Sequence, residues 1–139
     1  MKMRAPDETI GPDTDPYMRR WWLIRNEKFR VYLHQFLRSD DDRALHDHPA
    51  DNISILLIGD YLEHLSDGSI KHRRAWRPWA PWRLIARRAA EAHRIELIDR
   101  NRVWTLFIRG PTTRVWGFYC PQGWTPWTDF VQTRRGETQ

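Results

Sequence analysis

The chain has 139 residues, a length that suits one domain, and its single cysteine, Cys120, excludes an internal disulfide and predicts a cytoplasmic location. Its formal net charge is +5, and arginine supplies nearly all of the positive charge, which suits the binding of planar anions such as carboxylates and phosphates. The N-terminal residues contain no apolar core of the kind a signal peptide needs, and no later apolar run approaches the roughly 20 residues of a membrane helix, so the sequence predicts neither.

The two ends of the chain differ in composition from its centre. Residues 1–16 carry several prolines among acidic residues, which predicts a flexible arm without regular structure. Residues 131–139 are mostly polar and charged, and we expect a flexible tail there. Between the two ends we find no repeat, low-complexity tract or linker, so residues 17–130 are predicted to form one domain.

Short β-branched or aromatic runs dominate this domain, and each run is bounded by Gly, Pro, Asn or Asp. The predicted strands are residues 29–37, 53–58, 61–65, 82–85, 93–98, 103–108 and 114–120. Residues 66–69 predict a hairpin turn, whereas residues 87–92 show a short helical pattern. Many short strands with hardly any helix predict an all-β fold, either an antiparallel sandwich or a small barrel.

Three histidines have the spacing of metal ligands. His46 and His48 are two residues apart, and on a strand residues i and i+2 share one face, so both imidazoles can chelate one ion. A third ligand has to come from a strand distant in sequence, and His93 opens an alternating run of that kind. Three histidines on one side of a pocket leave coordination positions open, as a catalytic metal requires. The histidines without a partner at ligand spacing are His34, His64 and His72.

Two motifs carry a family resemblance. The segment HDHPADNISILLIG, residues 46–59, resembles the first motif of the cupin superfamily, with Asn52 where that motif has a glutamate. RAAEAH, residues 88–93, resembles the second motif, with arginine and alanine in place of its proline and glycine. The chain is more closely similar to small single-domain cupin-like proteins. The resemblance implies a single-domain cupin-type antiparallel β-barrel, also called a double-stranded β-helix or jelly roll. It also implies one divalent transition metal, with iron favoured and zinc, nickel or manganese open.

The missing glutamate bears on the kind of metal site. Cupins that keep it bind the metal through three histidines and that carboxylate. A three-histidine site without it resembles the site of thiol dioxygenases, which bind iron and leave positions for a thiol and dioxygen. An additional ligand could come from the amide oxygen of Asn52, or from Glu63 if the strand register turns it inward.

Arginines that face the pocket could bind the anionic end of a substrate. A guanidinium group can hold a carboxylate or phosphate through two parallel hydrogen bonds, and Arg94 and Arg109 are the candidates. Tyr32 and Trp104 are predicted to line the same cavity. These four assignments depend on strand parity, which one bulge would reverse.

The sequence leaves three functions open. The first is a small metal-dependent oxygenase of the non-haem iron type, acting on a small anionic or thiol-containing substrate. The second is a non-catalytic sensor or binding module for a small ligand or, because the chain is basic, for a nucleic acid, although charged runs are usually solvated. The third is an isomerase or lyase that uses the metal as a Lewis acid. The resemblance also implies a homodimer formed through edge strands.

Overall fold

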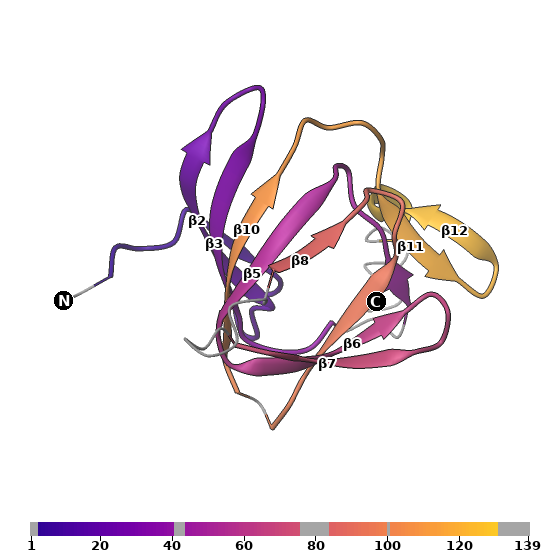
Figure 1. Cartoon of the computed structure of the whole chain (residues 1–139), viewed down its shortest axis with the longest axis horizontal. Helices are drawn as coiled ribbons and strands as arrows, with labels where there is room; N and C mark the ends of the chain where they lie inside the picture. Colours follow the sequence, from indigo (N-terminus) through magenta and orange to yellow (C-terminus); the bar gives the residue numbers. More distant parts are fainter. Residues whose placement is uncertain (1–2, 41–43, 76–83, 100, 131–139) are drawn as a thin grey trace.

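The computed structural model describes residues 3–40, 44–75, 84–99 and 101–130. In this part of the chain, twelve strands form two antiparallel sheets (Figure 1). The first sheet contains, in spatial order, β1 (Glu8–Ile10), β2 (Met18–Arg25), β3 (Arg30–Phe36), β10 (Val103–Arg109), β5 (Asn52–Ile58) and β8 (Leu84–Arg87). The second contains β12 (Gly123–Pro126), β11 (Gly117–Cys120), β4 (Leu45–His46), β9 (His93–Leu97), β6 (Asp60–Leu65) and β7 (Ile70–Arg74). Among these residues, no helix has the length and apolar character needed to cross a bilayer.

The predicted all-β, antiparallel fold is confirmed, although the two sheets do not close into one barrel. The helical run expected at residues 87–92 is wrong, because Arg87 ends β8 and a turn follows it. The arm expected at residues 1–16 is also not free of regular structure, because β1 pairs with β2. The flexibility of that arm stays a prediction, and the tail at 131–139 lies outside the described residues.

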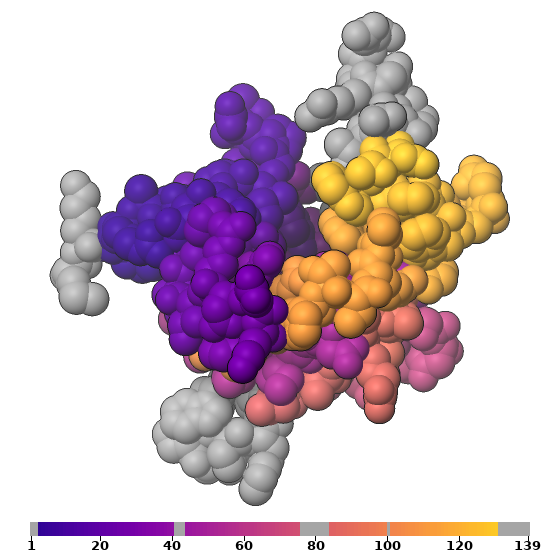
Figure 2. Space-filling view, turned by 90° about the horizontal axis from the view of Figure 1, so that it is seen from above, coloured from indigo at the N-terminus to yellow at the C-terminus, as the bar shows by residue number. Residues whose placement is uncertain are grey.

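The sequence pattern does not predict β2. A bulge between Trp22 and Ile24 shifts its register against β3, so the inward and outward positions exchange part of the way along the strand. A fixed period of two is therefore absent from its sequence, MRRWWLIR. Figure 2 shows the N-terminal segment, in indigo, on the opposite side of the molecule from the C-terminal segment, in yellow.

Gly59 carries the chain from one sheet to the other. It connects β5 to β6 with a φ of +81°, in the left-handed region that favours glycine. A Cβ atom at this position would lie 2.7 Å from the carbonyl oxygen of Arg102. Both observations explain why a glycine follows the predicted run at 53–58. After this glycine, β6 lies in the second sheet, whereas β5 lies in the first.

The inward faces of the two sheets change from apolar to polar along the strands. The hydrophobic core consists of Met18, Phe36, Leu56, Tyr61, Ile85, Ile95, Leu97 and Val103. From this core, the inward side of β9 continues through Ile95 to His93, and that of β5 continues from Leu56 through Ser54 to Asn52. One end of the sandwich is therefore a packed core, and the other end holds buried polar side chains.

His34 is a buried histidine between these two regions. Its ring stacks on Phe107 with ring centroids 5.1 Å apart and meets Phe36 edge to face. Arg20 donates a hydrogen bond from Nε to Nε2 of His34 at 3.0 Å. Burial, reinforced by the positive charge of Arg20, lowers the pKa of His34 well below its ordinary value of 6.5. His34 is therefore neutral in the folded protein.

This buried neutral histidine predicts a loss of stability in acid. Because its pKa is lower in the folded state, its contribution is fully present above about pH 6.5 and declines as the pH falls below that value. The loss grows as the pH falls from about 6.5 to about 5, because the unfolded chain then binds the proton that the folded protein excludes. Urea unfolding of wild type and His34→Gln at about pH 7.5 and pH 5 measures it, since glutamine can still accept from Arg20. Equal declines in both proteins would contradict the assignment.

Candidate metal centre

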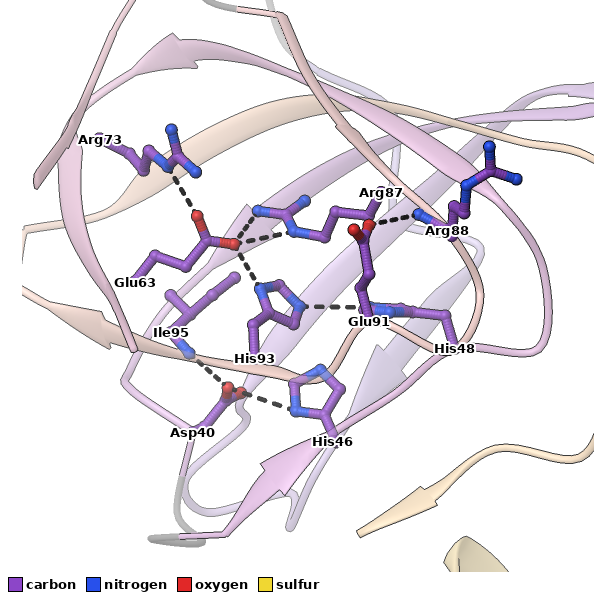
Figure 3. Close-up of polar contacts among 10 residues, drawn as sticks. All are labelled: Asp40, His46, His48, Glu63, Arg73, Arg87, Arg88, Glu91, His93 and Ile95. Atoms are coloured by element: carbon purple, nitrogen blue, oxygen red, sulfur yellow. Dashed lines mark hydrogen bonds and ion pairs between the residues drawn. The ribbon is translucent and has the colours of Figure 1, made fainter. Parts of the chain in front are cut away.

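The three predicted metal ligands lie together in the structure (Figure 3). His46 is on β4, His48 follows two residues later, and His93 opens β9, where it pairs in register with His46. One ring nitrogen from each histidine lies within 4.8 Å of the other two. His93 is buried, and the other two histidines are partly buried. Residues far apart in sequence thus form one donor set.

The separation of two of these nitrogens matches a shared metal ion. Nε2 of His48 and Nε2 of His93 are 3.3 Å apart. Two nitrogens each about 2.05 Å from a tetrahedral ion are separated by about 3.3 Å. Imidazole nitrogens are also the donors that iron, zinc and nickel accept in proteins. The residues therefore fit one transition metal ion in both chemistry and spacing.

Glu63 contacts the ring nitrogen of His93 that does not face His48. Nδ1 of His93 lies 2.7 Å from Oε1 of Glu63, so this nitrogen carries the proton and donates it, which leaves the lone pair on Nε2. Arg87 also donates to Oε1, and Nε of Arg73 donates to Oε2 at 2.6 Å. Both carboxylate oxygens already have partners. The prediction of Glu63 as an additional direct ligand is therefore corrected, because its carboxylate contacts Nδ1 of His93, whereas Nε2 is the nitrogen that faces His48.

A second carboxylate lies behind His46. Oδ2 of Asp40 is 3.6 Å from Nδ1 of His46, and it accepts a hydrogen bond from the backbone N–H of Ile95 at 2.7 Å. The hydroxyl of Tyr17 donates to the other oxygen of Asp40. Asp40 thereby connects the segment before β4 to β9. A carboxylate thus lies on the Nδ1 side of two of the three imidazoles, but only Glu63 is within hydrogen-bond distance, the contact that orients metal-binding histidines.

Burial, reinforced by nearby positive charges, keeps two histidines of the cluster, His48 and His93, neutral. Burial lowers the pKa of His48 well below its usual range, and the neighbouring histidines, Arg87 and Arg109 add to the effect. Burial also lowers the pKa of His93 to about 4, although its hydrogen bond to Glu63 opposes the shift. For Glu63, burial alone would raise the pKa, but the bond from His93 and the charge of Arg87 hold it well below its usual range. The site therefore presents two neutral imidazoles, those of His48 and His93, beside the ionised carboxylate of Glu63.

Asp47 anchors the ligand segment to the C-terminal strands. It lies between the two ligand histidines in sequence, so its side chain points to the opposite side, where it is fully buried. It accepts hydrogen bonds from Arg114 at 2.6 Å, from the backbone of Gly117 at 2.8 Å and from Trp124 Nε1 at 3.0 Å. Sequence reasoning missed this residue, because the alternation of sides within His-Asp-His shows only that its side chain points away from the two histidines, not which groups it binds.

Replacing Asp47 by alanine is expected to destabilise the protein by about 3 kcal/mol, because three donors lose a buried charged acceptor. Denaturant unfolding followed through tryptophan fluorescence measures the loss, since Trp124 is one of the donors. Asp47→Asn keeps one acceptor oxygen and is expected to lose less. A loss below about 1 kcal/mol in the alanine variant would contradict the anchoring role.

Of the four predicted substrate-binding residues, the structure turns two inward and two outward. Tyr32 is buried on the inward face of β3, and Arg109 shares the inward side of β10 with buried Val103 and Thr105. Trp104 lies on the other side of β10 and stacks on Trp21, with ring centroids 5.4 Å apart. Its assignment to the cavity is therefore wrong.

Arg94 is also wrongly assigned to the cavity. It follows the inward-facing His93, so its side chain points outward, where Nη2 contacts His64 at 3.0 Å. Asn52 faces inward and is 4% exposed. Its amide nitrogen donates to the carbonyl of Ala50, whereas Oδ1 has no hydrogen-bond partner among the described residues. The role of Asn52 as an additional metal ligand stays a prediction.

Comparison with known proteins supports the fold. No protein family model and no curated protein matches this chain. Among solved structures, a cupin superfamily protein from Desulfitobacterium hafniense matches with a TM-score of 0.53 at 13% identity, over 80% of this chain and 84% of that one. The DMSP lyase DddQ from Ruegeria pomeroyi has a TM-score of 0.59 at 15% identity, over 88% of this chain and 61% of that one. Fe(II) HppE has a TM-score of 0.58 at 12% identity, over 78% and 60% respectively.

These likenesses define the fold of the chain. It is similar to the double-stranded β-helix of the cupin structures, as the motifs predict. The chain spans about three fifths of the length of DddQ and of HppE, so its similarity to those two covers part of each. Within this fold lies the cluster of three histidines that could hold a metal ion.

Proposed function

We propose that His46, His48 and His93 hold one divalent transition metal ion, with iron as the ion used in the cell. The observation that carries this proposal is the cluster of three imidazoles with nitrogens within 4.8 Å of one another. The hydrogen bond from Nδ1 of His93 to Glu63 supports it, because this bond fixes the ring and leaves the lone pair on Nε2 available. The Fe(II) form of HppE, a structural neighbour, supports the choice of iron.

We further propose that the protein is a small metal-dependent oxygenase acting on a small anionic or thiol-containing substrate. A metal bound to three histidines offers open coordination positions for a substrate heteroatom and dioxygen. The chain itself supplies neutral donors, holds the imidazole proton of His93 on Nδ1 through Glu63, and excludes water with the apolar half of the sandwich. Arg109 on the opposite sheet orients the anionic end of the substrate.

Oxygen consumption tests this proposal. Protein loaded with Fe²⁺ is mixed with small thiols and organic acids in an oxygen electrode, beside His93→Ala treated in the same way. We expect substrate-dependent oxygen uptake that the variant lacks. Equal uptake by the variant, or turnover of a substrate without oxygen, would contradict the oxygenase proposal.

A lyase is the second candidate, and the structural similarity to the DMSP lyase DddQ favours it. Such a reaction would use the same metal as a Lewis acid, and its products would form at the same rate with and without dioxygen. The sensor or nucleic-acid-binding module stays a prediction, which a salt-dependent shift of DNA or RNA would support. Homodimer formation and a cytoplasmic location also stay predictions.

A further inference from the structure

Three arginines and one asparagine form a row across the inward side of the first sheet. In register, Arg30 of β3 lies opposite Arg109 of β10, Arg109 lies opposite Asn52 of β5, and Asn52 lies opposite Arg87 of β8. Residues directly opposite one another on neighbouring strands point to the same side of a sheet. This row, which we call the arginine row, lies at the polar end of the sandwich, the end that holds His93.

The charges of the arginine row are only partly balanced. Arg87 is paired with the buried carboxylate of Glu63. Among the described residues, no carboxylate pairs with Arg30 or Arg109; the side chain of Arg109 donates instead to the carbonyl of Gly110 and the hydroxyl of Thr112. Like charges directly opposite on two strands destabilise a sheet. The fold therefore keeps two adjacent unbalanced guanidinium groups on its inward side at a cost in stability.

The arginine row lies close to the histidine cluster. Arg87 and Arg109 both act electrostatically on His48, and burial together with the charge of Arg30 lowers the pKa of Arg109. Asn52, Arg87 and Arg109 line a pocket of about 660 Å³. That volume is in the range of small-molecule sites, so a molecule in the pocket can contact these three members of the row. Asp51 and Glu91 also line the pocket, whereas Arg30 lies next to it, opposite Arg109 in the strand register.

Asn52 adds an unused acceptor between the charges. Its side chain is 96% buried, and Oδ1 has no partner among the described residues. A buried amide oxygen without a hydrogen bond costs free energy, typically about 1–3 kcal/mol, which a ligand that donates a hydrogen bond would recover. The donor must lie beside the anion, because Cα atoms of opposed residues such as Asn52 and Arg109 are about 4.5–5.5 Å apart.

We propose that Arg30 and Arg109 bind the carboxylate of a small organic acid while Asn52 accepts a hydrogen bond from its neighbouring hydroxyl or amino group. The ligand class is therefore a 2-hydroxy or 2-amino acid. This inference deepens the proposed function and rests on it only for the reaction that the ligand undergoes, since the arginine row can bind an anion without the metal. Arg30 and Asn52 become specificity-determining residues, and Arg109 keeps its predicted role.

Calorimetric titration with defined probes tests the site. Protein loaded with Zn²⁺ is titrated with acetate, glycolate and inorganic phosphate, and metal content is measured in every sample. Arg30→Gln and Arg109→Gln are each expected to weaken glycolate binding at least tenfold, about 1.4 kcal/mol, while metal content stays unchanged. Asn52→Leu should weaken glycolate binding but not acetate binding. The matched control is Arg94→Gln, whose guanidinium contacts His64 on the outer side, and it should bind as wild type does.

Four further results would overturn or support the assignment. Glycolate affinity unchanged in both arginine variants would overturn it, and so would phosphate binding tighter than glycolate binding. A melting temperature of Arg30→Gln equal to or above that of wild type would support it, because the variant removes a like-charge repulsion. Acetate binding that persists in His93→Ala, but is lost when Arg109→Gln is added, would establish the anion site even if the metal proposal failed.

Discussion

Replacing Glu63 by alanine is expected to destabilise the protein by about 3–5 kcal/mol, the cost of breaking a buried ion pair by removing one partner. The Glu63 side chain is fully buried and has Arg73, Arg87 and His93 as partners. Its loss leaves the guanidinium group of Arg87, which is 6% exposed, without a counter-charge. Urea unfolding of wild type and variant at neutral pH measures the difference.

Glu96→Ala is the matched control for this substitution. Glu96 also forms ion pairs with a histidine and an arginine, His64 and Arg94, but its side chain is 42% exposed. Exposed ion pairs contribute about 1 kcal/mol or less, so this variant should unfold close to wild type. Glu63→Gln, which keeps the shape but not the charge, is expected to fall between the two. Equal losses of unfolding free energy in Glu63→Ala and Glu96→Ala would contradict the conclusion that Glu63 stabilises the fold as the buried partner of Arg87.

Metal loading is expected to stabilise the protein by about 4 kcal/mol when the free ion is present at a thousand times its dissociation constant. The folded state brings His46, His48 and His93 together, whereas the unfolded chain keeps them up to 47 residues apart. Binding energy therefore adds to folding energy. Thermal unfolding with and without added Fe²⁺ or Zn²⁺ measures the shift, and a chelator should reverse it.

The control for metal loading is the effect of the same ions on His93→Ala. This variant lacks one of the three donors and should show almost no shift. His72→Ala is a useful comparison, because His72 is an exposed histidine whose Nε2 lies 3.4 Å from Asp60, outside the cluster. An equal shift in wild type and His93→Ala would mean that the ions act elsewhere.

Several strands could be predicted from local patterns in the sequence. The runs at 53–58 and 103–108 match β5 and β10 to within one residue, because both are rich in β-branched or aromatic residues and are followed closely by glycine or proline. Strands without that pattern were not predictable. β2 contains a bulge, β7 is mostly exposed with four polar residues, and β4 is two residues long.

The site was predictable where spacing determines it and not where distant partners do. The i, i+2 spacing and the two motifs were enough to select the histidines that the structure brings together. Glu63 was predicted as a ligand on condition that the strand register turned it inward. The pairing of β6 with β9 does turn it inward, but it places the carboxylate against Nδ1 of His93. The role of Asp47 depends on donors 67 to 77 residues away, which no local pattern specifies.

Strand parity explains the two wrong pocket residues. Once His93 faces inward, Arg94 must face outward, since adjacent residues of a strand point to opposite sides. The same rule separates Trp104 from its inward neighbours Val103 and Thr105. Arg30 could have been found in the same way, because it shares parity with Tyr32 on β3. Parity taken from one known ligand is therefore a stronger guide than the chemical suitability of single residues.

The metal content of protein purified without added metal or chelator tests the central claim most directly. Elemental analysis of wild type is compared with His93→Ala and with the double variant His46→Ala/His48→Ala. We expect close to one transition metal ion per chain in wild type and almost none in either variant, with all three proteins folded by circular dichroism. Wild-type protein without metal, even after reconstitution with Fe²⁺ or Zn²⁺, would contradict a metal centre at these histidines.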